Sequence, residues 1–222
     1  MGKDPTSYTV QDLVMNTVSS GLILIFVAGS GKSVLTAMAI DYVCDKHGEL
    51  RNAKPIRFAY HFFKSNQEHK NLKRRDIVSR LLKLLASARP LPSKVQEFYK
   101  ERSESSPPKY EELVDLLCSC AIDSSAFVFF DAFDEATTEQ RKATSDLIRR
   151  LVNCDVRVFL TSQPQFTPRV QEISEFRELK VVANAGDLET YIAHELRPEW
   201  PQLPEEEYTA LQRRLIIESG GM

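Results

Sequence analysis

The chain has 222 residues, of which 42% are hydrophobic and 27% are charged, and its formal net charge is −2. This length suits one α/β domain with a sizeable core, or one domain with an appendage, and the composition is ordinary for a globular protein. The charge gives no basic field and no apolar run could span a bilayer, so we expect neither nucleic acid nor membrane as a partner and take the cytoplasm as the location.

The four cysteines have no spacing typical of a metal site. Cys44, Cys118, Cys120 and Cys154 include no C-x-x-C pair, and two of them lie in an apolar helical pattern. We therefore predict buried free thiols in a reducing compartment.

Strand and helix patterns alternate along the chain in three regions. Residues 1–20 are expected to form a short amino-terminal helix or arm, since a capping box at Thr9 precedes apolar residues at helical spacing. Residues 21–185 are expected to form the core, and residues 186–222 to form carboxy-terminal helices that begin a truncated helical extension.

Within the core, apolar β-rich runs predict strands at 21–27, 56–63, 126–130, 156–161 and 176–182. Helical spacing of apolar residues predicts helices at 32–45, 77–88, 113–120, 143–151, 187–196 and 205–218. Prolines bracket residues 90–108, which are expected to form a looser stretch.

Continuous apolar strands between amphipathic helices predict an α/β fold: a three-layer sandwich in which helices cover both faces of a parallel sheet. Ligands of such sheets bind at the carboxyl ends of the strands. Three motifs fall at these ends.

The first motif, Gly29-Ser30-Gly31-Lys32-Ser33, lies between an apolar strand and a helix, which is the context of a phosphate-binding loop. Glycines let backbone N–H groups turn toward phosphate oxygens, and the helix N-terminus adds positive charge. Lys32 would hold the β- and γ-phosphates and Ser33 would ligate Mg²⁺. The alternative is a strand–turn–helix with a chance Gly-Lys-Ser. Phe26 stands where the full pattern has glycine, and a ring there crowds the loop.

The second motif ends the strand at 126–130 with three carboxylates, Asp131, Asp134 and Glu135. Asp131 at the strand tip would orient Mg²⁺ or its water, Glu135 would polarise the attacking water, and Asp134 would assist. The alternative is that these acids cap the next helix.

The third motif is the polar strand tip Thr161-Ser162-Gln163-Pro164. It would lie beside the γ-phosphate if its strand runs between the other two motif strands, and otherwise it is a simple strand–turn ending.

Together the three motifs resemble the NACHT-type NTPase domains of the STAND class, and in particular the nephrocystin-like N-terminal domains of fungal ankyrin- and WD-repeat proteins. The resemblance extends over about residues 20–222. The matching stretches are Ala28–Leu35, Phe130–Glu135, Leu160–Pro164, Asp187–Ile192 and Ser219–Met222.

The resemblance implies a five-stranded parallel P-loop NTPase sheet with the third-motif strand between the other two. It implies ATP or GTP with Mg²⁺, slow hydrolysis, and a nucleotide-controlled switch that governs homo-oligomerisation and signalling between effector and repeat domains. The nucleotide contacts that it implies are Ala28, Gly29, Ser30, Gly31, Lys32, Ser33, Val34 and Gln163. The implied metal ligands are Ser33 and Asp131, and the implied catalytic residues are Asp134 and Glu135.

Gln163 stands where the family has an arginine, and Ala28 where proline is common. A neutral amide does not neutralise transition-state charge, so hydrolysis is expected to be weak or absent while binding persists. The chain also ends before the family's usual winged-helix region, so protein partners would act through missing effector or repeat domains. Two other functions stay open: a nucleotide-free interaction scaffold and a P-loop kinase of a small substrate.

Overall fold

The computed structural model describes residues 21–26, 31–46, 55–87, 90–101, 107–122, 124–166, 176–181, 186, 190, 194, 198 and 201–218. The expected amino-terminal helix, residues 28–30 of the phosphate loop and most of the helix expected near 187–196 lie outside this part of the chain.

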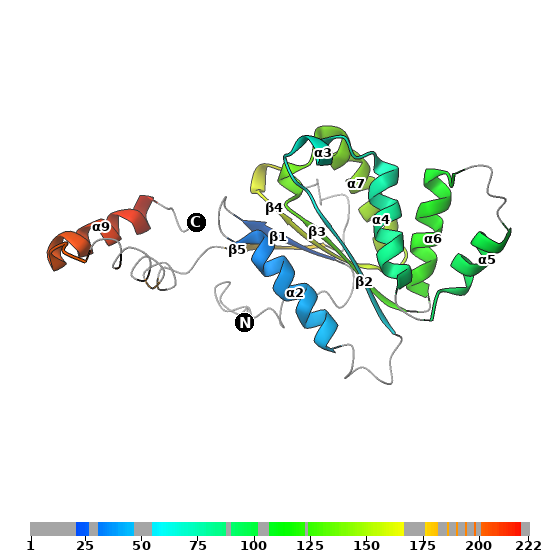
Figure 1. Ribbon diagram of the computed structural model, residues 1–222, viewed down its shortest axis with the longest axis horizontal. Helices are drawn as coiled ribbons and strands as arrows, with labels where there is room; N and C mark the ends of the chain where they lie inside the picture. Colours follow the sequence, from blue (N-terminus) through cyan, green and yellow to red (C-terminus); the bar gives the residue numbers. More distant parts are fainter. Residues whose placement is uncertain are drawn as a thin grey trace.

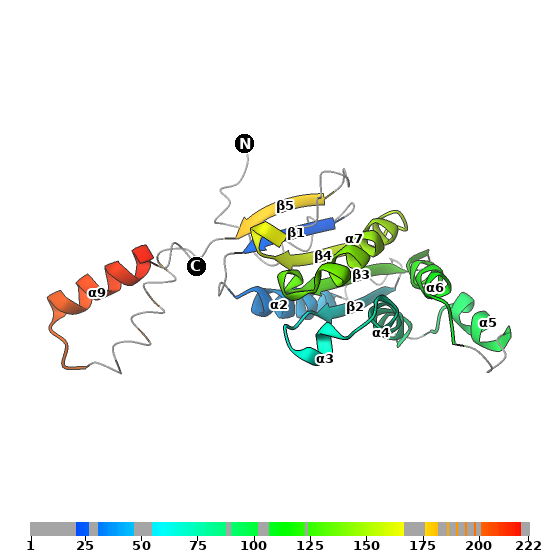
Figure 2. The same cartoon turned by 90° about the horizontal axis from the view of Figure 1, so that it is seen from above.

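A parallel five-stranded sheet forms the centre of the domain, with the order β2-β3-β4-β1-β5. The strands are β1 (Gly21–Phe26), β2 (Ile56–Phe62), β3 (Ser125–Asp131), β4 (Arg157–Ser162) and β5 (Phe176–Val181). Figure 2 shows them side by side in this order. Each predicted strand is present, and the predicted position of the third-motif strand, between the other two, is confirmed.

Helices cover both faces of the sheet, which confirms the predicted three-layer sandwich (Figure 1). The helices are α2 (Lys32–Lys46), α3 (Gln67–Lys70), α4 (Arg74–Ser87), α5 (Ser93–Glu101), α6 (Tyr110–Ile122), α7 (Thr138–Val152) and α9 (Glu205–Glu218). Of these, α4, α6 and α7 share one core with one face of the sheet, and α2 packs on the other face. None of these described helices has the length and apolarity needed to span a bilayer.

Strand β3 shows why the strand sequences are continuously apolar. Phe127 and Phe129 pack in the core with α2, whereas Val128 and Phe130 pack in the core beneath α4, α6 and α7. Because successive side chains of a strand point to opposite faces, a strand covered on both sides needs apolar residues at every position.

The looser stretch predicted over residues 90–108 is wrong in part, because it contains helix α5. Pro90 and Pro92 precede this helix instead of interrupting it, and the carbonyl of Pro92 accepts hydrogen bonds from Val95 N and Gln96 N. Proline before or in the first turn costs a helix no hydrogen bond, and buried Val95 anchors α5 to the domain.

The prediction of four buried free thiols is confirmed only in part. All four cysteines are free, but Cys120 alone is buried, whereas Cys44, Cys118 and Cys154 are half-buried. Burial raises the pKa of Cys118 to about 12 and that of Cys120 to about 11. The prediction failed because helix α6 presents Cys118 at the rim of a cavity, which helical spacing alone does not reveal.

Candidate functional site

The strand order brings the three motifs together at the carboxyl ends of the strands. Because β4 lies between β1 and β3, the tip of β4 lies next to both the start of α2, which follows β1, and Asp131 at the end of β3. In a parallel sheet all carboxyl ends lie at the same edge, where ligands of α/β proteins bind.

Asp131 is the centre of this site and is only 2% exposed. Its Oδ2 accepts a hydrogen bond from Ser33 Oγ at 2.5 Å, and its Oδ1 accepts from Thr36 Oγ1 at 2.7 Å and from Thr161 Oγ1 at 2.6 Å. Thr161 Oγ1 in turn accepts from Ala132 N at 3.0 Å. Helix α2 and strand β4 therefore both fix the orientation of one carboxylate.

This carboxylate has hydroxyl donors but no positive partner among the described residues. A buried charge is costly unless it is paired or coordinates a metal. Mg²⁺ is usually held by one or two carboxylates together with phosphate oxygens and water, rather than by an all-protein cage. Ser33 and Asp131 thus fit the ligand set that the sequence predicts for Mg²⁺.

Lys32, the first residue of α2, faces the second carboxylate of the site. Its Nζ lies 3.5 Å from Asp134 Oδ2, and the two side chains are 12% and 7% exposed. Asp134 Oδ1 also accepts a hydrogen bond from Gln163 N at 3.3 Å. The three motifs are therefore joined by direct contacts: the first with the second, and the second with the third.

Glu135 lies in a different direction from Asp134. The chain turns after β3 at Ala132, whose φ of 53° and ψ of 47° are left-handed, and it enters the short helix η2 (Phe133–Glu135). Glu135 Oε2 then accepts a hydrogen bond from Ser65 N at 2.9 Å, in the connection from β2 to α3. Glu135 is thus held at the rim of the site by the end of the neighbouring strand.

The described part of the phosphate loop begins at Gly31, whose φ of +82° is a conformation that L side chains rarely adopt. Leu35 N donates to Gly31 O at 3.0 Å, which is the first helical hydrogen bond of α2. The N–H groups before it have no partner within the helix and are available to an anion. Ala28, Gly29 and Ser30 lie outside the described residues, as does the side chain of Phe26.

Two further residues predicted to contact nucleotide are described. Val34 is 65% exposed on α2, and the side chain of Gln163 accepts a hydrogen bond from Gln165 Nε2 at 3.0 Å. Sequence reasoning also missed Thr36 and Ser65. Thr36 lies three residues after Ser33 and hence on the same helix face, a spacing that could have indicated its role. Ser65 contributes a backbone N–H, for which no sequence signal exists.

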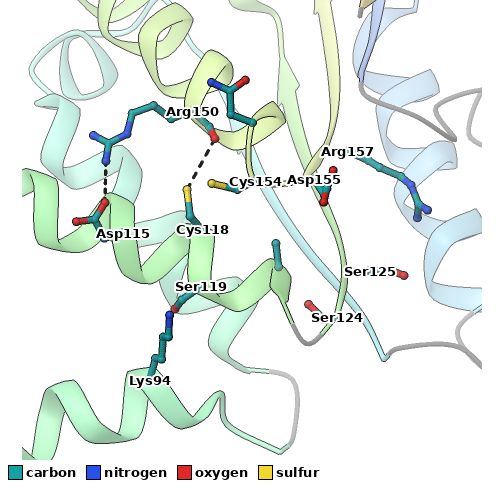
Figure 3. Close-up of a pocket in the computed structure, with 12 residues that line it drawn as sticks. Lys94, Asp115, Cys118, Ser119, Ser124, Ser125, Arg150, Cys154, Asp155 and Arg157 are labelled. Atoms are coloured by element: carbon teal, nitrogen blue, oxygen red, sulfur yellow. Dashed lines mark hydrogen bonds and ion pairs between the residues drawn. The ribbon is translucent and has the colours of Figure 1, made fainter.

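A separate cavity of about 810 Å³ lies at the opposite edge of the sheet (Figure 3). Ser125 and Arg157, the first residues of β3 and β4, line it together with Cys118 and Cys154. Because this is the amino-terminal edge of the strands, the cavity is distinct from the site around Asp131.

Comparison with known families matches residues 6–163 to the family described as "Nephrocystin 3, N-terminal". No curated protein matches the chain.

Solved structures show the same fold at low identity. A Signal Transduction ATPase with Numerous Domains (STAND) protein with a tetratricopeptide repeat sensor, from Pyrococcus horikoshii, has a TM-score of 0.54 and 12% identity, covering 94% of this chain and 28% of that one. The ORC2 protein of Aeropyrum pernix, in ADPNP–ADP complexes, has a TM-score of 0.53 and 12% identity, covering 82% and 49%. The ORC1 protein of Aeropyrum pernix, in complex with DNA, has a TM-score of 0.51 and 16% identity, covering 85% and 47%.

This chain therefore spans half or less of the length of each of these solved chains. One of the three is bound to DNA, so the prediction that nucleic acid is not a partner finds no support in these comparisons.

Proposed function

Since this chain belongs to the nephrocystin 3 N-terminal family, we propose that it is a nucleotide-binding switch module that takes ATP or GTP with Mg²⁺ and hydrolyses it slowly or not at all. Its NTPase-like fold and the site around Asp131 support the binding function. The proposed partners are a second copy of the chain and the sensor or effector domains of the protein in which it acts.

The observation that carries the proposal is the contact between Ser33 and Asp131, 2.5 Å apart although 98 positions separate them in sequence. A hydroxyl at the start of a helix and a carboxylate at a strand tip are the protein groups that hold Mg²⁺ in P-loop NTPases. Thr36 and Thr161 keep the carboxylate in place, so these protein groups are already oriented for the ion.

Lys32 would hold the phosphates, and its ion pair with Asp134 gives a physical basis for switching. A bound phosphate and Asp134 would compete for the same ammonium group. Nucleotide would then free Asp134 and, through the hydrogen bond from Gln163 N, alter the contact between η2 and the tip of β4.

Slow or absent hydrolysis is proposed from two features of the site. Gln163 brings no charge to the tip of β4, so this strand cannot neutralise charge that develops in the transition state. Glu135 is bound to Ser65 N and would have to exchange this partner for a water molecule before acting as a base.

The test is a titration of the purified chain with a fluorescent ATP analogue in Mg²⁺. Saturable binding is expected in the natural chain, and its loss is expected in Lys32→Ala. Lys100→Ala, on the exposed surface of α5, is the matched control and should bind like the natural chain. Equal binding by Lys32→Ala would overturn the proposed phosphate site.

The second candidate function is a nucleotide-free interaction scaffold, and the presence of phenylalanine at position 26 favours it. A Phe26→Gly variant separates the two functions. Binding that appears only in this variant would mean that the natural chain has lost its ligand, whereas equal binding by both chains supports the switch.

A further inference from the structure

Strand β2 is at one end of the sheet, and no described strand lies beyond it. On its inner side, Pro55 O accepts from Ser125 N and Phe63 N donates to Asp131 O. In a parallel ladder the N–H and C=O of one residue point to the same side of the strand, and successive residues alternate between the two sides. The N–H and C=O groups of four residues of β2 therefore point outward: Ile56, Phe58, Tyr60 and Phe62. None of the turn, loop and cap hydrogen bonds of the described residues uses these groups.

A cavity of about 610 Å³ lies at the carboxyl-terminal part of this free edge. It is lined by Tyr60 and Phe62 from one face of β2 and by His61, with Arg80 and Lys83 of α4, from the other. Ser33 at the start of α2 also lines it, so the cavity extends from the proposed metal site to the edge of β2. The cavity thus reaches the last three residues of β2 on both faces, beside the outward backbone groups of Tyr60 and Phe62. The exposed ring of Tyr60 packs edge-on against Phe62, with centroids 5.5 Å apart, and gives the edge an apolar surface.

The edge cavity is positively charged. Lys64, Arg80 and Lys83 line it. Among the described residues, no acidic side chain lines the cavity and no hydrogen bond or ion pair engages these three side chains. His69 also lines it, and its buried Nδ1 has no hydrogen-bond partner there. Burial, together with the positive charge of Arg80 and His69, lowers the pKa of His61 to about 4. The cavity therefore has unpaired positive charge beside a row of free backbone donors and acceptors.

We propose that the edge of β2 docks an extended acidic peptide segment of a partner protein, which joins the sheet as a further strand and sets its carboxylates against Lys64, Arg80 and Lys83. Strand addition to an open edge gains affinity from main-chain hydrogen bonds and specificity from alternate side chains. A second copy of this edge does not fit, since pairing two copies would bring Lys64, Arg80 and Lys83 of one close to the same cations of the other. Nucleic acid would meet the cations but leave the outward backbone groups without matched partners.

The probe is a fluorescein-labelled heptapeptide of alternating Glu and Val, titrated with the full chain and followed by anisotropy. We expect saturable binding, and clearly weaker binding of a peptide of equal charge in which proline replaces each Val and removes its N–H donor. Equal binding of both peptides would show electrostatic attraction without strand addition and would overturn the proposal, as would no binding of the first.

The matched variants reverse two charges each. Arg80→Glu with Lys83→Glu should weaken peptide binding about tenfold, as expected for several rim charges acting together. Lys100→Glu with Lys142→Glu, on exposed positions of α5 and α7, should leave it unchanged. Thermal unfolding by circular dichroism checks that each variant is folded. In competition, a single-stranded oligodeoxynucleotide and unlabelled peptide each displace the labelled peptide. If the oligodeoxynucleotide does so at the lower concentration, the edge is assigned to nucleic acid instead.

Discussion

Lys32 and Asp134 form an ion pair, with Nζ and Oδ2 3.5 Å apart, between the first residue of α2 and the turn that follows β3. A phosphate group must replace Asp134 as the partner of Lys32 if the proposed function is correct. The pair therefore opposes nucleotide binding to the extent that it stabilises the domain.

Replacement of Asp134 by Asn should remove this competition. We expect the variant to bind the fluorescent ATP analogue at least about tenfold more tightly, because the pair is largely buried and its loss frees the ammonium group for phosphate. Asp146→Asn is the control, because Asp146 pairs with Arg149 at 2.7 Å on the exposed surface of α7. Weaker binding by Asp134→Asn would show that Asp134 assists the nucleotide or its metal instead of competing with them.

Thr161 should be important for stability as well as for the site. Thr161→Val removes the donor to Asp131 Oδ1 and leaves the buried N–H of Ala132 without its acceptor, so we expect a loss of about 1–3 kcal/mol in the free energy of unfolding. Urea unfolding measures this loss. Thr144→Val is the matched control, because Thr144 is equally buried but its Oγ1 has no hydrogen-bond partner among the described residues. Similar losses in the two variants would mean that the hydroxyl contacts at Asp131 contribute little.

Acid should destabilise the domain through His61. Burial, with a smaller effect of Arg80 and His69, lowers the pKa of His61 in the folded chain from 6.5 to about 4. Above pH 6.5 the ring is neutral in both states. As the pH falls from 6.5 toward 4, only the unfolded state gains the proton, and the folded state is destabilised.

The difference between the pKa of His61 in the unfolded chain and in the folded chain corresponds to a loss of about 2 kcal/mol in the free energy of unfolding between pH 7 and pH 5. Urea unfolding of the natural chain and of His61→Gln at both pH values tests it, and the variant should show a smaller loss. His194→Gln, at an exposed position, should behave like the natural chain. Equal losses in all three proteins would show that other groups cause the acid sensitivity.

Turnover should respond to charge at position 163. Gln163→Arg places a cation at the tip of β4, beside Asp134, and we expect the rate of ATP hydrolysis to rise about tenfold, a part of what one preorganised charged group contributes in other enzymes. Release of phosphate under saturating nucleotide measures the rate. Gln96→Arg adds the same charge on the exposed surface of α5 and should have little effect. An unchanged rate in Gln163→Arg would place the limiting step elsewhere, for example at the contact between Glu135 and Ser65.

Much of the fold follows from the sequence because its strands are buried on both faces. The run Ala126–Phe130 is apolar at every position, and the strand found there differs from the predicted one by a single residue at each end. Helix α5 was missed because Pro90 and Pro92 were interpreted as breaking structure when they precede a helix start.

The convergence of Lys32, Ser33 and Asp131 was predictable, because their motifs follow strands of one parallel sheet. The site was not predictable where a residue's role depends on the path of the backbone. Glu135 reaches Ser65 only because Ala132 adopts a left-handed conformation, and alanine gives no sign of such a turn.

The position of β4 also determines when the site can form as the chain folds. Ser33 and Asp131 are 98 positions apart, and Thr161, which binds the same carboxylate, lies on a strand that must enter between β1 and β3. Contacts of such long range form slowly, and a chain still emerging from the ribosome cannot complete them before β4 is available. The residues of the proposed magnesium and phosphate site thus come together only after four of the five strands have been made, so that nascent chains interrupted before Ser162 would have no completed site.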